Sequence, residues 1–529
     1  MQTNINFNPN PNPNPNDKEY FDILKMIQKN YKKYNKIKKI NKEQLSYKSK
    51  NPRQSEINAQ LFQLYDYLHE EFNNLKTLTN SSCFKHKFVR IDKNNHVIDP
   101  NLLKSSYIPS KIKNYIMENA SILLEYYCSI GNERTVKINF IIFNNNSYEL
   151  NNIKKKSASY FKNCVLKIYI WLKILSKYSN KECGKNLECF IYFTPFKRKL
   201  PHSYASQNDK NDKNNINDKY VNRVHDNNDS DDSDDPYTVY TAGKGETIDK
   251  TFKPYHVNGG VSDVCQKNGQ IIVYRREEWF KVFVHETMHN YGLDFSNLDI
   301  SSANKKLMSI FSIQKDIKIF ESYCEVWARI MNVFFESYFE TNEHSKLLFM
   351  PTSTRKNIIN RIHKHNYNST KKYLSTDDNI KDIKYKFLDI FYDNIQHESI
   401  FSIFQCVKIL NFMGLDYDII TNVNDSNYIT VHKLYKENTN VFAYYIIVSI
   451  IISNFNNFIL WCIDNNINLF NFKKDSKAID SFVMFIYKNY KNSDLLKVIN
   501  ESEKKIIDNP DMDINLLNTM RMSVIGGSR

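Results

Sequence analysis

Apolar residues recur at helical spacing along the first quarter of the chain, so residues 17–134 are expected to form a helical N-terminal region. One segment shows the pattern well, because apolar side chains return every three or four positions between Ile57 and Leu68, and Ser55 ahead of them suits a helix N-cap. Helices are predicted near residues 18–42, 56–77 and 110–129.

The pattern changes at residue 135, where runs rich in β-branched and aromatic residues begin. Such runs are typical of strands, and their alternation with a helical stretch indicates a mixed sheet within residues 135–300. A further helix starts directly after the last strand and should end at Gly292, a residue suited to a helix C-cap. The strands are predicted at 135–144, 187–194 and 269–275, with a helix at about 156–178.

From about residue 303 onward every apolar segment has helical spacing, which predicts an all-helical region over residues 301–529. The uncharged stretch 441–463 is long enough to cross a bilayer, but Asn454 interrupts it. The apolar run before that asparagine has the length of a buried core helix, so we do not expect a membrane span. Strands in the middle and helices on both sides make the expected fold class α+β.

Two segments are too polar to contribute to a core and are predicted to be disordered. Residues 1–16 form an Asn-Pro tail, and residues 205–236 form a low-complexity insertion that is acidic at its end. The acidic residues lack the glycine and terminal glutamate spacing of an EF-hand loop, so calcium binding there is not favoured.

The chain has 73 Lys and Arg against 58 Asp and Glu, a formal net charge of +15. This excess keeps a basic nucleic-acid-binding protein open as an alternative function. However, the lysines are spread along the chain, as expected for solvated helix faces, and no helix-turn-helix, RNP or zinc-finger pattern occurs. Nucleic acid is therefore not the expected partner.

The nine cysteines are scattered and form no CxxC pair, a pattern that favours reduced thiols in an intracellular compartment. The N-terminal residues show no basic-then-apolar secretion signal. A cytoplasmic protein that is not secreted is expected.

HETMH at 285–289 is the most informative segment of the chain. Residues four apart share one face of a helix, so His285 and His289 can present both imidazoles to one tetrahedral Zn²⁺ ion. Glu286 lies beside them and can take a proton from an attacking water. The competing interpretation is an amphipathic helix with two unrelated histidines, but the predicted strand directly before the helix favours the metal site.

A zinc site of this type needs a third protein ligand, and the helix predicted at 313–335 offers Glu321 and Glu325 one turn apart. The motif and this pair resemble the gluzincin metallopeptidases. In that family a small residue follows the glutamate ligand by three positions, and an acid at four often orients a zinc histidine. Glu321, Cys324 and Glu325 match, so the resemblance implies Glu321 as the ligand and Glu325 as the acid that orients a zinc histidine. EVWA at 325–328 also permits the reverse assignment.

HETMHNYG is also similar to the metzincin signature, in which a glycine leads to a third histidine or aspartate. Gly292 fits, but the ligand position is Phe295 and Asp294 lies one residue short, so this alternative is weaker. The chain also resembles zincin-like proteins of large DNA viruses in its asparagine-rich composition and in the run EEWFKVFVHETMHNYGLDFS. The resemblance implies a zincin-like catalytic core between the two helical regions and an intracellular or virion location.

The expected activity is hydrolysis of a peptide or protein substrate, with Gly259 and Gly260 near an edge that binds the substrate backbone. The alternative is a catalytically inactive zinc-binding protein with a structural or virion-associated role. Gluzincins usually add a residue that stabilises the oxyanion. The candidates are His256, Tyr291 and Tyr323.

Overall fold

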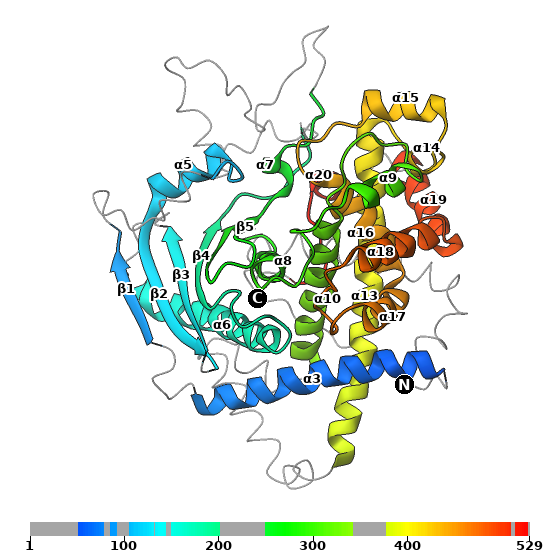
Figure 1. Cartoon of the computed structure of the whole chain (residues 1–529). Helices are drawn as coiled ribbons and strands as arrows, with labels where there is room; N and C mark the ends of the chain where they lie inside the picture. Colours follow the sequence, from blue (N-terminus) through cyan, green and yellow to red (C-terminus); the bar gives the residue numbers. More distant parts are fainter. Residues whose placement is uncertain are drawn as a thin grey trace, which may run out of the picture.

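The computed structural model describes residues 51–78, 85–91, 105–131, 133–143, 150–201, 249–341, 377–508 and 514–526. The predicted tail 1–16, the helix at 18–42 and the insertion 205–236 lie outside the described residues. Within those limits the fold is α+β, with one six-stranded mixed sheet and many helices (Figure 1).

The sheet has the strand order β1-β2-β3-β4-β6-β5. The first three strands are antiparallel neighbours, β3, β4 and β6 run parallel, and the short β5 pairs antiparallel with β6 at the far edge. In this last pair Gly260 lies opposite Val273 and Ser262 lies opposite Ile271. The strands are β1 (Lys85–Arg90), β2 (Ala120–Ile130), β3 (Arg134–Phe143), β4 (Asn186–Thr194), β5 (Gly260–Ser262) and β6 (Asn268–Arg275).

The prediction of one helix over 110–129 is wrong. The helix α5 (Ser110–Asn119) ends after ten residues, and the chain continues directly as strand β2. Because β2 pairs with β3 over its whole length and buries most of its side chains, long-range pairing overrides a local spacing that also suits a helix. The three strands that were predicted in the middle of the chain correspond to β3, β4 and β6.

Helices cover the sheet unequally (Figure 1). On one face lie α6 (Leu150–Ser176) and α8 (Trp279–Asn290), within the large buried core that continues into the C-terminal helices. On the other face α5 covers a smaller apolar cluster. The remaining helices are α3 (Pro52–Leu78), α7 (Pro254–Val257), α9 (Ser301–Met308), α10 (Ile319–Thr341), α13 (Asp377–Met413), α14 (Tyr417–Thr421), α15 (Asp425–Leu434), η3 (Phe442–Ile447), α16 (Val448–Ser453), α17 (Phe455–Asn465), α18 (Ser476–Asn489), α19 (Ser493–Asp508) and α20 (Ile514–Asn518).

The uncharged stretch 441–463 folds as two helical pieces. Phe442–Ser453 and Phe455–Asn465 meet at an angle of 93°, with Asn454 at the bend. In the described part of the chain, no single helix is long and apolar enough to cross a membrane.

The expectation that all cysteines are reduced thiols is wrong, because Cys183 and Cys265 form a disulfide. The bond joins the loop before β4 to the loop after β5, across 82 residues of sequence. Spacing could not show this pair, because the two loops become neighbours only through the pairing of β4 with β6. The other described cysteines are free and buried.

Candidate metal centre

The motif helix α8 is fully buried and starts directly after β6. Its end follows the prediction: the helix stops at Asn290, and Gly292 adopts a left-handed conformation with φ +62°. The amide of Gly292 donates to the carbonyl of His289, so a local hydrogen bond closes the last turn. His285 and His289 therefore lie on a rigid, buried element.

The N-terminal turn of α10 brings Glu321 to the two histidines. Glu321 Oε2 lies 3.1 Å from His285 Nε2 and 3.4 Å from His289 Nε2, and the two Nε2 atoms are 3.2 Å apart. Ligand atoms at tetrahedral corners around a zinc ion, with bonds near 2.05 Å, would be separated by about 3.3 Å. The three predicted ligands thus converge with the spacing that the ion needs.

Glu325 lies on the other side of the His285 ring. Its Oε2 atom is 3.3 Å from His285 Nδ1, while its carboxylate binds Lys281 Nζ at 2.8 and 2.9 Å and Arg329 Nε at 2.9 Å. Glu321 therefore lies at His285 Nε2, the inner nitrogen that faces His289, and Glu325 lies at Nδ1, the outer nitrogen on the opposite side of the ring. The i,i+4 pairing with Arg329, which the sequence also suggested, coexists with this arrangement.

Asp294 holds the second histidine in the same way, with Oδ2 at 2.7 Å from His289 Nδ1. A carboxylate on the outer nitrogen of a metal-binding histidine fixes the orientation of its ring. In the sequence, Asp294 was considered only as a metzincin ligand, and it lies one residue short of the position that a metzincin ligand occupies. Phe295, the next residue, instead packs in the core with its ring centroid 4.1 Å from that of Phe472.

The charges of the cluster reinforce one another. Burial opposes ionisation of Glu321, but the neighbouring His289 and His285 outweigh it and hold the pKa of Glu321 well below its usual range. Burial also opposes protonation of His289, yet Cys324, Asp294 and Glu321 raise the pKa of His289 well above its usual range. Asp294 and Glu321 thus stabilise a positive charge on the His289 ring.

Glu286, next to the first histidine, points to the edge strand β5. Its Oε2 atom accepts a hydrogen bond of 2.9 Å from the Ser262 hydroxyl, and burial raises the pKa of its carboxyl. The predicted glycine pair leads into this strand. A Cβ atom on Gly260 would lie 2.9 Å from Glu286 Oε1, and one on Gly259 would lie 2.2 Å from an Arg198 nitrogen. The strand approaches the helix this closely only because both residues lack side chains.

Replacing Gly260 with Ala tests this close approach. The added methyl group would lie 2.7 Å from Val282 Cγ1 and 3.0 Å from Glu286 Cγ, so both side chains or the strand must shift. The motif predicts that Glu286 is the general base of a zinc peptidase, and misplacing a catalytic group by about 1 Å can cost roughly 10²-fold. On that prediction, kcat for peptide hydrolysis should fall by about 10-fold or more, with zinc content unchanged. Steady-state kinetics and metal analysis measure both. The comparison is Gly131→Ala, where a Cβ meets no atom within 4 Å but the left-handed backbone (φ +65°) is strained, so it reports the effect of backbone strain away from Glu286. Equal kcat in the two variants would contradict the role of Gly260.

The tyrosine at the site was not among the candidates from sequence. Tyr444 donates a hydrogen bond of 2.8 Å to Glu321 Oε2, and its ring centroid is 5.7 Å from that of His285. It lies on η3, a π-helical turn, and such turns occur often at functional sites. Its position within an apolar stretch gave no local signal.

The three predicted oxyanion candidates have their contacts elsewhere. The Tyr323 hydroxyl donates to the carbonyl of Phe470 at 2.8 Å, and His256 Nδ1 accepts from the amide of Lys253. Tyr291 is buried with its ring 5.0 Å from the Arg134 guanidinium. None of these contacts involves His285, His289 or Glu321.

Two imidazoles and one carboxylate therefore face a common point, and carboxylates support both rings from behind. Two nitrogen donors and one oxygen donor, with a further carboxylate nearby that is not a ligand, are typical of catalytic zinc sites. Here that further carboxylate is Glu286. No protein-family model, curated protein or solved structure matches this chain.

Proposed function

We propose that the protein is a zinc-dependent peptidase with a gluzincin-type site, in which His285, His289 and Glu321 hold the metal. The convergence of these three side chains, with donor atoms 3.1–3.4 Å apart, carries the proposal. The arrangement of the sheet supports a zincin-like core, because an antiparallel edge strand lies beside the motif helix.

When bound, zinc would polarise the scissile carbonyl and make a water molecule more acidic. Glu286 then acts as general base, taking the proton of the attacking water and returning it to the leaving amine. Burial raises the pKa of this carboxyl, which makes the carboxylate a stronger base toward the attacking water. Ser262 orients this carboxylate from the edge strand.

The substrate binds along β5 in this proposal. Only one edge of that strand pairs, with β6, and among the described residues no strand lies on its other edge. An extended peptide can add there as a further strand, with its backbone held next to Glu286. Gly260, which allows the close approach, belongs to the same strand.

Tyr444 is the best-placed group to stabilise the developing oxyanion, because its hydroxyl reaches a proposed ligand and its ring contacts His285. Replacing Tyr444 with Phe should lower kcat by about 10²-fold with a smaller change in KM, since one lost oxyanion donor typically costs about 10²–10³-fold. Tyr417→Phe is the matched control, a buried tyrosine whose hydroxyl bonds the Tyr490 carbonyl. Unchanged kcat in Tyr444→Phe would remove it from the mechanism.

The experiment that tests the proposed function combines metal analysis of the purified protein with an assay on a mixture of unstructured peptides. One zinc per chain together with cleaved peptides supports it. Bound zinc without any cleavage favours the rival, a catalytically inactive zinc-binding protein.

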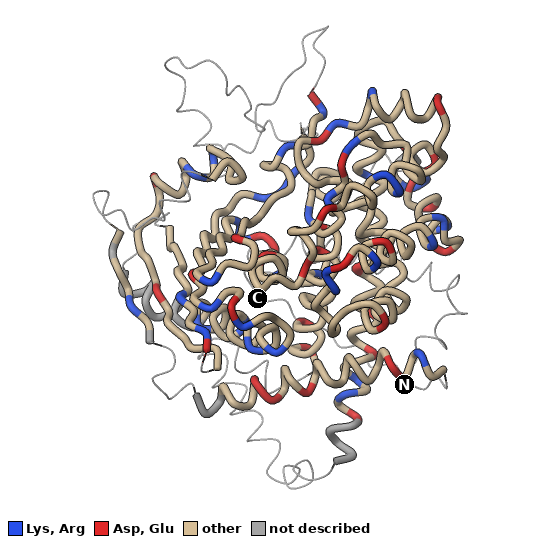
Figure 2. Tube along the Cα trace, in the orientation of Figure 1, with Lys and Arg blue, Asp and Glu red and all other residues tan. Residues whose placement is uncertain are grey.

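The charge distribution does not support the other alternative, a nucleic-acid-binding protein. Figure 2 shows Lys and Arg interspersed with Asp and Glu along the described chain, without the separate basic surface that nucleic-acid binding uses.

A further inference from the structure

A stretch at the end of the described chain, residues 519–526, is buried against the start of the motif helix; we call it the C-terminal segment. Met520 and Val524 are fully buried although the segment forms no helix. Side chains from distant elements bind its backbone, since the Tyr445 hydroxyl donates to the Met520 carbonyl at 2.6 Å and Glu398 Oε2 accepts the Val524 amide at 3.0 Å. The segment is therefore fixed by specific contacts.

The C-terminal segment binds the residue that directly precedes the motif helix. Glu278, the N-cap residue of α8, accepts the amides of Met522 at 3.1 Å and Ser523 at 2.6 Å, and it binds Arg198 at 2.6 Å. The backbone of Glu278 is left-handed, with φ 55°, a conformation that residues with side chains seldom adopt. These contacts stabilise Glu278 in this conformation at the start of α8.

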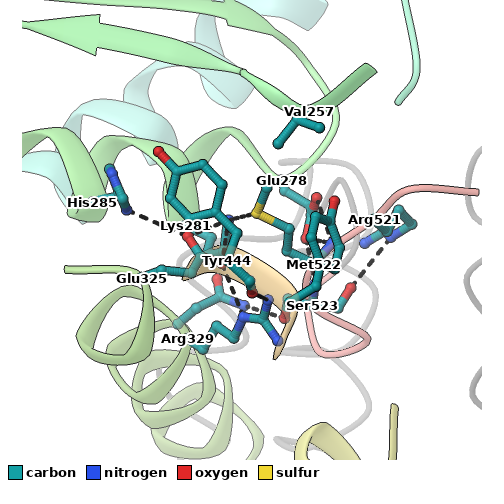
Figure 3. A network of polar contacts seen from close by, with 12 residues as sticks. Val257, Glu278, Lys281, His285, Glu325, Arg329, Tyr444, Arg521, Met522 and Ser523 are labelled. Carbon is teal, nitrogen blue, oxygen red and sulfur yellow. Dashed lines mark hydrogen bonds and ion pairs between the residues drawn. The ribbon is translucent and has the colours of Figure 1, made fainter. Parts of the chain in front are cut away.

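One turn further along α8, Lys281 connects the C-terminal segment to the metal cluster. Its ammonium lies 3.3 Å from Met522 Sδ and 2.8 and 2.9 Å from the two Glu325 oxygens, and its side chain is only 2% exposed. Because Lys281 contacts both oxygens, it fixes the plane of the Glu325 carboxylate. That carboxylate is the group that faces His285 Nδ1 (Figure 3).

Arg329 extends the same network to the opposite side of the cluster. Besides Glu325, its guanidinium binds the backbone carbonyl of Tyr444 at 3.0 Å (Figure 3). It also binds the Ser402 hydroxyl at 2.8 Å. A single buried network thus contacts one imidazole and the tyrosine that reaches Glu321.

We infer that Lys281 is a positioning residue of the metal centre and that the C-terminal segment fixes it, so that contacts more than 230 residues away in sequence set the orientation of His285. The inference rests on the proposed function. Lys281 has no part in the chemical step, because its ammonium is bound to Glu325, on the outer side of the ring. Its effect is on how well the imidazole presents Nε2 to a metal.

The test uses the full chain with Co²⁺ as probe, because the visible absorption of bound Co²⁺ reports its coordination geometry. Lys281→Met and Glu278→Gln are compared with wild type for the Co²⁺ spectrum and for zinc affinity. Lys281→Met is expected to change the spectrum and to weaken zinc binding by about 10- to 100-fold, as for other residues that orient a ligand. Glu278→Gln should change the Co²⁺ spectrum and the zinc affinity in the same direction as Lys281→Met, but to a smaller extent.

The matched controls are Lys167→Met and Glu336→Gln, which break another largely buried Lys-Glu pair, with the atoms 2.9 Å apart. These variants should melt at lower temperature than wild type yet keep its Co²⁺ spectrum. If Lys281→Met does not fold, Glu278→Gln, which preserves size, carries the test. Folded variants with wild-type spectrum and affinity would overturn the inference alone, whereas a wild type that binds neither metal would overturn the proposed metal centre and the inference with it.

Discussion

Replacing Glu286 with Gln is expected to lower kcat for peptide hydrolysis by about 10²–10⁴-fold, the usual contribution of a general base. The amide has the size of the carboxylate and can still interact with the Ser262 hydroxyl, but it cannot take a proton from water. Because Glu286 is not among the proposed ligands, zinc content should stay at that of the wild type. Kinetics on a fluorogenic peptide and metal analysis of the same preparation give both numbers.

The control for this substitution is Glu437→Gln, since Glu437 is also buried but binds Lys315 and the amide of Phe442 instead of the cluster. It should leave kcat near the wild-type value in protein that remains folded. Wild-type activity in Glu286→Gln would exclude this residue as the base and with it the proposed mechanism.

Loss of a proposed ligand should have the largest effect on metal binding. In His289→Ala or Glu321→Ala two donors remain, and a zinc site with two protein ligands binds far more weakly than one with three. We expect purified protein to contain little zinc and affinity to fall by well over the roughly 100-fold that outer partners cost. Equilibrium dialysis with zinc, followed by metal analysis, measures the loss without any substrate.

Two variants on the same helix make this experiment discriminating. Glu336→Ala removes a glutamate with 19% side-chain exposure, close to the 15% of Glu321, and should keep full zinc content. Glu325→Ala should weaken zinc binding less than Glu321→Ala does, because Glu325 faces the outer nitrogen of His285. The reverse order would make Glu325 the ligand, the assignment that the sequence alone left open.

The parts of the site that were predictable from sequence depend on spacing within one helix. His285 and His289 share a face of α8, and Gly292 follows its end, because four-residue steps and glycine caps are local properties. Glu321 was predicted from the gluzincin-like pattern on α10. Its approach to the histidines is tertiary and had to wait for the structure.

The features that sequence reasoning missed depend on contacts between distant segments. Tyr444 reaches Glu321 across 123 residues, and the strand β2 looked helical until its pairing with β3 was known. The disulfide arises from two loops that only the sheet brings together. Asp294 is the exception, since it lies five residues from His289 and a search for outer carboxylates would have found it.

The disulfide between Cys183 and Cys265 encloses β4, α7 and β5 in one covalent ring. In the chain-entropy picture, closing a ring of this size removes roughly 4–5 kcal/mol of unfolded-state freedom. A second consequence concerns backbone cleavage: a single cut anywhere inside the ring leaves both products tethered by sulfur. The strand bearing Ser262 would then stay attached to the rest of the sheet even in a nicked molecule.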